Sequence, residues 1–223
     1  MDQLVTANVA TNLYWLGRNL ERAKQMLYKI SKAYDLIIDV DRDAGVKLFQ
    51  TFDIKLEYSD SVDFLQQAIM GEHSSNILEI MTNARESAII CRHRIDSEAF
   101  GEMIELHALF DTLTKTDIEI DYKLIDKAHS LISEIYGALA KREHTNNSDL
   151  FIRMGKLVEE ADFRLRFNKD ETITMTVIDE IDAIVKTLSD EDEESTKQTQ
   201  SQSSDETDLI TAINTKINQV IVE

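Results

Sequence analysis

The sequence predicts an all-α protein, a multi-helix bundle with an internal pseudo-repeat, and three observations lead to that prediction. The chain of 223 residues contains no proline and six glycines, and proline is the residue that most strongly breaks helix interiors. Apolar residues recur at alternating spacings of three and four, which is typical of a helix with one buried face. A block of sequence at 13–23 is also similar to a block at 151–161.

The first helix is expected at about 4–38. Its apolar seam alternates spacings of three and four over Leu13, Leu16, Leu20, Ala23, Leu27, Ile30, Tyr34 and Ile37, a pattern of bundled helices. The segment DVDRDAG at 39–45 then interrupts the pattern, and Gly45 is expected to be a turn residue.

Seven further helices are expected, joined by short connections as in a helical bundle. Ser97 suits a helix start, and the helix before it has the seam Ile77, Met81, Ala84, Ala88, Cys91 and Ile95. The expected ranges are about 46–57, 61–70, 75–95, 98–114, 121–142, 148–168 and 172–188.

Composition divides the chain into three parts. Residues 1–188 form the predicted bundle, and 189–208 contain eight acidic residues, one lysine and no large apolar residue. Such a segment cannot bury enough surface to offset chain entropy, so it is expected to be a disordered acidic linker. Residues 209–223 are expected to form an amphipathic helix. This helix has three candidate docking sites: its own bundle, a neighbouring subunit in a homo-oligomer, or a partner.

Charge and motif content exclude several classes of function. The formal charge of −18 argues against general binding of nucleic acid or anionic membranes. One cysteine, no signal-peptide pattern and no apolar run of membrane-spanning length indicate a soluble cytoplasmic protein. Phosphate-binding loops and di-metal helix motifs are missing from the sequence, so no cofactor and no metal is expected and any catalytic residue is unknown.

The first helix has a second face that carries chemistry. At about 100° per residue, Trp15, Arg18, Glu21 and Arg22 fall opposite the apolar seam. One interpretation is packing against another helix, with the arginines bonded to carboxylates or helix C-termini. The other is a pocket in which two guanidiniums hold a phosphate or carboxylate while Glu21 orients one of them.

A second basic patch lies in NARESAIICRHRIDSEAF at 83–100. Arg85 and Arg92 are seven residues apart and share a stripe beside the apolar seam. They are either salt-bridge residues of an acidic protein, or they converge with Arg18 and Arg22 on one basic pocket.

The pseudo-repeat aligns LYWLGRNLERA with FIRMGKLVEEA at an offset of 138 residues. Gly17 matches Gly155, Glu21 matches Glu159, and Arg18 corresponds to Lys156. The shared glycine and glutamate predict a pseudo-symmetric pair of helices and add Glu159 to the candidate binding residues.

These three blocks resemble the alpha-E domain family, a helical family with a Glu-Arg motif. The first block carries Gly17, Arg18, Glu21 and Arg22 at the family positions. The second and third are looser matches, because Ile89 and Glu160 stand where the family tends to have arginine. The resemblance covers about residues 4–188.

The resemblance implies a role beside ATP-grasp amide ligases, transglutaminase-like proteins and the proteasome-like peptidase Anbu, in systems that modify peptides. The favoured hypothesis is an accessory or binding subunit that holds an anionic or peptide-like group in an Arg/Glu pocket. Two alternatives stay open: an enzyme acting on an activated carboxylate or amide, and a structural interaction module.

Overall fold

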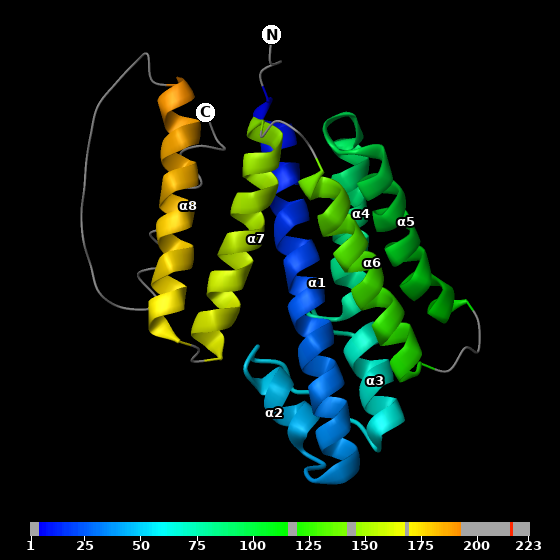
Figure 1. Ribbon diagram of the computed structural model, residues 1–223. Coiled ribbons are helices and arrows are strands. Elements are labelled where there is room, and N and C mark those ends of the chain that lie inside the picture. The colour runs from blue at the N-terminus through cyan, green and yellow to red at the C-terminus, as the bar shows by residue number, and fades with distance from the viewer. Residues whose placement is uncertain (1–4, 116–119, 142–145, 168–169, 193–214, 216–223) are drawn as a thin grey trace. The chain divides into compact units, whose positions relative to one another are not determined.

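The computed structural model describes residues 5–115, 120–141, 146–167, 170–192 and 215, and all regular secondary structure in these ranges is helical (Figure 1). The prediction of an all-α helical bundle is confirmed. The α-helices of the described residues are α1 (Ala7–Asp39), α2 (Ala44–Gln50), α3 (Ser61–Met70), α4 (Ile77–Ile90), α5 (Ser97–Asp111), α6 (Tyr122–Ala140), α7 (Asn147–Arg166) and α8 (Glu171–Asp192), with the short 3-10 helices η1 (Arg92–Arg94) and η2 (Thr112–Thr114).

Six of the helices begin at an Asp or Asn whose side chain accepts a backbone N–H of the first turn, and this capping explains why they start where they do. The capping residues are Asp60, Asn76, Asp96, Asp121, Asn146 and Asp170. At α7 the cap is reciprocal, because the Asp149 side chain also accepts the backbone N–H of Asn146.

Two predictions about α2, one for its start and one for its end, differ from the structure. Gly45 lies within α2 and is not a turn residue; a β-carbon there would lie 2.5 Å from the Phe64 ring. The helix expected to reach residue 57 ends at Gln50, and Asp53 adopts a left-handed backbone with φ of 58°. Close packing at Gly45 and the left-handed backbone at Asp53 are both features that apolar periodicity does not contain.

Three other boundaries also move. The helix expected to reach residue 95 ends at Ile90 and is followed by η1. Ser97 is the first residue of α5 and its N-cap is Asp96, whose carboxylate accepts the N–H of Glu98 at 2.8 Å. Helix α8 continues to Asp192, into residues assigned from sequence to the acidic linker.

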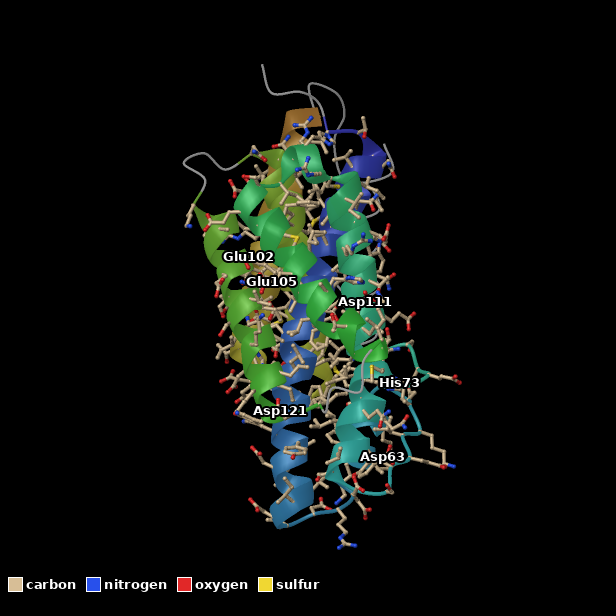
Figure 2. All side chains as sticks on the ribbon, turned by 90° about the vertical axis from the view of Figure 1, so that its right-hand side faces the viewer. Asp63, His73, Glu102, Glu105, Asp111 and Asp121 are labelled. Carbon is tan, nitrogen blue, oxygen red and sulfur yellow. The ribbon has the colours of Figure 1, made fainter. Side chains whose placement is uncertain are left out.

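The chain divides into two units, and α1 contributes to both. Asn19–Glu143 form one unit, called here the central unit, and Met1–Arg18 with His144–Glu223 form the other, called the terminal unit. The central unit contains the later part of α1 and helices α2 to α6, in which α3 packs on α4, α4 on α5 and α5 on α6. Figure 2 shows its side chains, with Glu102 and Glu105 on α5 and His73 after α3.

The terminal unit contains the start of α1, together with α7 and α8, which pack on each other. Its helices α1 and α7 approach so closely that a side chain fits at neither of two glycines. A β-carbon on Gly17 would lie 2.0 Å from the carbonyl oxygen of Ile152, and one on Gly155 would lie 2.0 Å from that of Tyr14. The contacts are reciprocal at the offset of 138 residues, which agrees with the predicted pseudo-symmetric helix pair.

Most of the seam predicted for α1 is buried: Leu13, Leu16, Leu20, Ala23, Leu27 and Ile30 are all inaccessible to solvent. Towards the end of the helix Ile37 is 8% exposed, and Tyr34 is only partly buried. Among the described residues, no helix combines the length and the apolar character that a bilayer crossing requires. The predicted helix at 209–223 and the linker beyond Asp192 lie outside the described residues, apart from Thr215.

Candidate functional site

Arg18 and Glu159 form a buried ion pair within the terminal unit. Helix α1 carries Arg18 one position after Gly17, and α7 carries Glu159 one turn after Gly155. The Arg18 Nε donates to Glu159 Oε2 at 2.9 Å, and a second guanidinium nitrogen, Nη2, lies 2.8 Å from the same oxygen. The Glu159 side chain is inaccessible and that of Arg18 is 15% exposed. The close helix crossing at the glycines brings the two side chains within reach.

Two aromatic rings complete the surroundings of Arg18. Its guanidinium carbon lies 5.1 Å from the centre of the Trp15 ring and 5.9 Å from that of Tyr14, both within cation–π range. Burial disfavours the charged guanidinium, but the Glu159 carboxylate, with smaller contributions from Tyr14 and Asp162, holds the Arg18 pKa above its ordinary value. Arg18 therefore stays charged, and its charge is paired with Glu159 inside the terminal unit.

Glu21 lies in the central unit and is also buried, with 1% of its surface exposed. Tyr136 on α6 donates its hydroxyl to Glu21 Oε2 at 2.9 Å, and Gln25 donates to Oε1 at 2.7 Å. Lys24 lies 3.3 Å from Oε1, and its ammonium group is 5.4 Å from the centre of the Tyr136 ring. The carboxylate is thus surrounded by three donors of its own unit and joins α1 to α6.

The predicted second face of α1 is therefore a packing face over much of its area. Tyr14 and Glu21 are buried and Arg22 is partly buried, whereas Trp15 keeps 42% of its surface exposed. Within each unit, the helix-packing interpretation agrees with the contacts that Arg18 and Glu21 make.

Arg85 and Arg92 both belong to the central unit, Arg85 in α4 and Arg92 in η1. Arg85 bonds to Glu86 at 2.5 Å, and its charge acts on His107 near the end of α5. Arg92 instead lies over the ring of Phe100, in the first turn of α5, at 5.0 Å from the ring centre. The pocket that Arg92 lines does not include Arg85, so this pocket does not bring the two arginines together.

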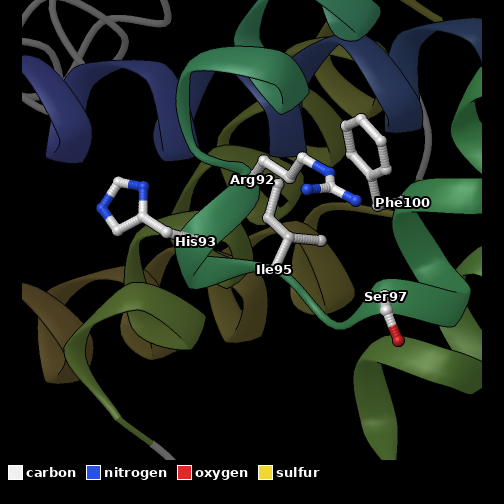
Figure 3. A pocket seen from close by; sticks show the side chains of 5 residues that line it. All are labelled: Arg92, His93, Ile95, Ser97 and Phe100. Atoms are coloured by element: carbon white, nitrogen blue, oxygen red, sulfur yellow. The ribbon is translucent and has the colours of Figure 1, made fainter.

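A pocket of about 370 Å³ lies at the turn between α4 and α5. It is lined by Arg92, His93, Ile95, Ser97 and Phe100 (Figure 3). Figure 3 shows the Arg92 guanidinium extending towards the Phe100 ring, with the His93 ring directed to the other side. Arg92 is exposed, and no described residue forms an ion pair with it.

The local sequence explains how this pocket is built. Helix α4 ends at Ile90, and η1 reverses the chain so that Arg92 faces the start of α5. Asp96 caps α5 and Ile95, 7% exposed, anchors the turn in the core. The buried Ile95 and the N-cap Asp96 thus fix the turn that places Arg92 beside the ring of Phe100, eight positions later.

Some partners were missed by sequence reasoning. Lys24 and Gln25 lie three and four residues after Glu21, so helical spacing alone contains that signal. Tyr136 is 115 residues from Glu21 and belongs to no motif, so nothing in the sequence indicates it. Phe100 stands within the second motif block, but its contact with Arg92 depends on the turn at η1.

Cysteine chemistry and metal binding are the two remaining possibilities among the described residues. Burial raises the pKa of the Cys91 thiol to about 11, so the thiolate is disfavoured at neutral pH. No three histidine, cysteine, aspartate or glutamate side chains gather as a metal-binding group in the part of the chain that the structure describes.

No curated protein and no solved structure matches the chain. The family model that matches, over residues 5–190, is Alpha-E, described as a predicted alpha-helical domain with a conserved ER motif. The only Glu-Arg dipeptide in the sequence is Glu21–Arg22, in the helix where Glu21 is buried and bonded. The match covers most of the chain, and the chain belongs to the Alpha-E family.

Proposed function

We propose that this protein is a binding subunit of a peptide-modifying system, working beside an ATP-grasp amide ligase, and that the Arg92 pocket holds an anionic group. The observation that carries the proposal is the exposed guanidinium of Arg92, which lies over Phe100 in a pocket of about 370 Å³. Arginine is well suited to carboxylates and phosphates because its planar fork donates two parallel hydrogen bonds.

The contacts of the other candidate residues support a structural role for α1, the helix that carries the Glu-Arg motif. Arg18 is bonded to Glu159, and Glu21 accepts from Tyr136 and Gln25. A group that moves protons must reach its substrate, and both carboxylates are enclosed by partners of their own unit. These contacts favour binding over catalysis, and the role beside a ligase rests on the family resemblance.

The anion site is tested by titrating the full chain, labelled with ¹³C at the isoleucine δ1 methyl groups, with sodium acetate and with phosphate at constant ionic strength. We expect the Ile95 methyl signal, assigned with the Ile95→Val variant, to shift, and the Ile181 signal on α8 to stay in place. Arg92→Ala should abolish the shift, because the pocket then has no guanidinium.

Arg153→Ala is the matched control, because Arg153 is an exposed arginine bonded to Glu180 on the other unit. It should leave the Ile95 titration unchanged. An Ile95 shift that survives in Arg92→Ala, or no shift with either anion, would contradict the proposed site.

The accessory role has a separate test. The full chain and an ATP-grasp ligase from the same genome should co-elute in size-exclusion chromatography with light scattering. We expect Arg92→Ala to keep this association, since the anion site and the ligase contact are different functions. Separate elution at micromolar concentrations of both proteins would count against a stable accessory subunit.

A further inference from the structure

The Arg92 pocket combines one cation with apolar walls. The Phe100 ring lies under the guanidinium, and the side chain of Ile95 is almost fully buried beside it. A ligand in this pocket therefore meets the apolar side chains of Phe100 and Ile95 beside one lining guanidinium.

The charges around the pocket disfavour a dianion. Asp96 is the N-cap of α5 and Glu98 stands in its first turn, one on each side of the pocket residue Ser97 in sequence. Lys141 adds no net positive charge, because it is bonded to Glu98 at 2.8 Å and its charge is also balanced by Asp96. Phosphate sites in proteins gather several cations or backbone N–H groups, whereas this pocket offers one lining guanidinium.

We infer that the pocket selects a carboxylate borne by an apolar group, such as the C-terminal residue of a peptide with an aliphatic side chain. This inference rests on the proposed anion site and names its ligand class. The carboxylate pairs with Arg92 while the aliphatic group packs on Phe100 and Ile95. A volume of about 370 Å³ is at the small end of ligand pockets, which suits one or two residues.

The test uses the Ile95 methyl signal of the full chain and four probes. These are N-acetyl-glycyl-leucine, its C-terminal amide, 4-methylvalerate and inorganic phosphate. We expect N-acetyl-glycyl-leucine to bind with a Kd of about 1 mM, as is usual for a ligand of this size in a shallow site. The amide should bind at least about tenfold more weakly, because it loses a charge-assisted hydrogen bond. Phosphate should also bind at least about tenfold more weakly.

Variants separate the two halves of the pocket. Arg92→Ala should abolish binding of all the anions, and Arg92→Lys should retain part of it, since lysine keeps the charge but not the planar fork. Phe100→Ala should weaken the binding of N-acetyl-glycyl-leucine and leave unchanged the Ile95 titration with acetate that tests the anion site. Phe100→Leu, which keeps an apolar wall, serves if the alanine variant is unfolded. Thermal unfolding of each variant checks that the fold is kept.

The outcomes distinguish this inference from the function on which it rests. Phosphate binding as tight as N-acetyl-glycyl-leucine would overturn the ligand class and leave the anion site standing. Equal binding of the amide would also overturn it. No binding of any probe would remove both proposals. Binding of 4-methylvalerate equal to the dipeptide supports the apolar carboxylate and assigns its source to free acids, whereas tighter binding of the dipeptide assigns it to peptide C-termini.

Discussion

At the scale of single residues, the Arg18–Glu159 pair affects stability most when only one of its two charges is removed. Taking two charges out of water is costly, and their attraction offsets that cost only while both are present. Glu159 is fully buried and Arg18 is 15% exposed, so removing the glutamate leaves a desolvated guanidinium without this carboxylate. The pair therefore specifies how α1 meets α7, while its net contribution to stability is small.

We predict that Glu159→Ala lowers the free energy of unfolding by about 3–5 kcal/mol, the usual cost of breaking a buried pair. The double variant Arg18→Met/Glu159→Leu should lose much less, because neither charge of the pair is then left without the other. Urea denaturation measures both, and fluorescence of Trp15, the only tryptophan, reports the region beside Arg18.

The exposed pair Arg153–Glu180 provides the control for this prediction. Both of its side chains are more than a third exposed, so Arg153→Ala should cost less than about 1 kcal/mol. A double variant at Arg18 and Glu159 as unstable as Glu159→Ala would show that the cost comes from lost packing and not from a buried charge.

At the residue scale, the sequence predicted which side chains make polar contacts better than it predicted the partners in those contacts. Helical geometry placed Arg18 and Glu21 on a face away from the leucine seam, and both residues make polar contacts there. The partners Glu159 and Tyr136 lie on other helices. The spacing of residues along one helix does not show which residues of remote helices meet it, so it does not show whether the arginines converge.

At the scale of helices, the crossing of α1 and α7 depends on two glycines. The atoms that a β-carbon would meet are backbone carbonyls of the facing helix, which cannot rotate away as a side chain can. Substitution therefore forces the two helices apart along their whole contact. The repeat was visible in sequence because this geometry requires glycine at both positions.

We predict that Gly17→Ala and Gly155→Ala each lower the free energy of unfolding by about 1–3 kcal/mol, the range for overpacking. Gly101→Ala in α5 and Gly137→Ala in α6 are matched controls, since a β-carbon there meets nothing within 4 Å. These controls should gain about 0.5–1 kcal/mol from helix propensity. Chemical denaturation of the four variants decides the matter, and a stabilised Gly17→Ala would refute the close crossing.

Helix ends were the least predictable features at this scale. The range 61–70 agrees with α3, because its cap, its apolar residues and the following glycine all indicate the same limits. The range 46–57 overruns α2, because the chain turns at 51–53 and Asp53 adopts a left-handed backbone, which nothing in the apolar spacing marks. Periodicity shows which residues are buried, and capping and packing decide where a helix stops.

At the scale of the whole molecule, composition indicated the fold class and the charge, but not the division into two units. The absence of proline allowed α1 to run through 33 residues, and one such helix contributes to both units. A continuous apolar seam has the same residue spacing whether it is buried in one core or divided between two. Sequence alone therefore predicted a bundle over 1–188 without its internal boundary.

Three half-buried histidines make stability depend on pH. Burial is the largest cause that lowers the pKa of His73, His107 and His129 below the ordinary value of 6.5. The unfolded chain then binds protons more readily than the folded chain, so the free energy of unfolding falls as the pH falls. This contribution is fully present above about pH 6.5 and is lost as the pH drops below that value.

His73 gives the sharpest test, because both ring nitrogens are used in the neutral form (Figure 2 shows its position). Nε2 donates to the carbonyl of Gln67 at 3.0 Å, and Nδ1 accepts the N–H of Ser75 at 3.3 Å. A second proton on Nδ1 would break the latter bond. We predict that His73→Gln has a smaller loss of unfolding free energy between pH 7 and pH 5 than the unaltered chain, measured by urea denaturation at each pH. Taking the difference between two chains cancels the effect of the carboxylates common to both, so equal losses would mean that His73 does not carry this pH dependence.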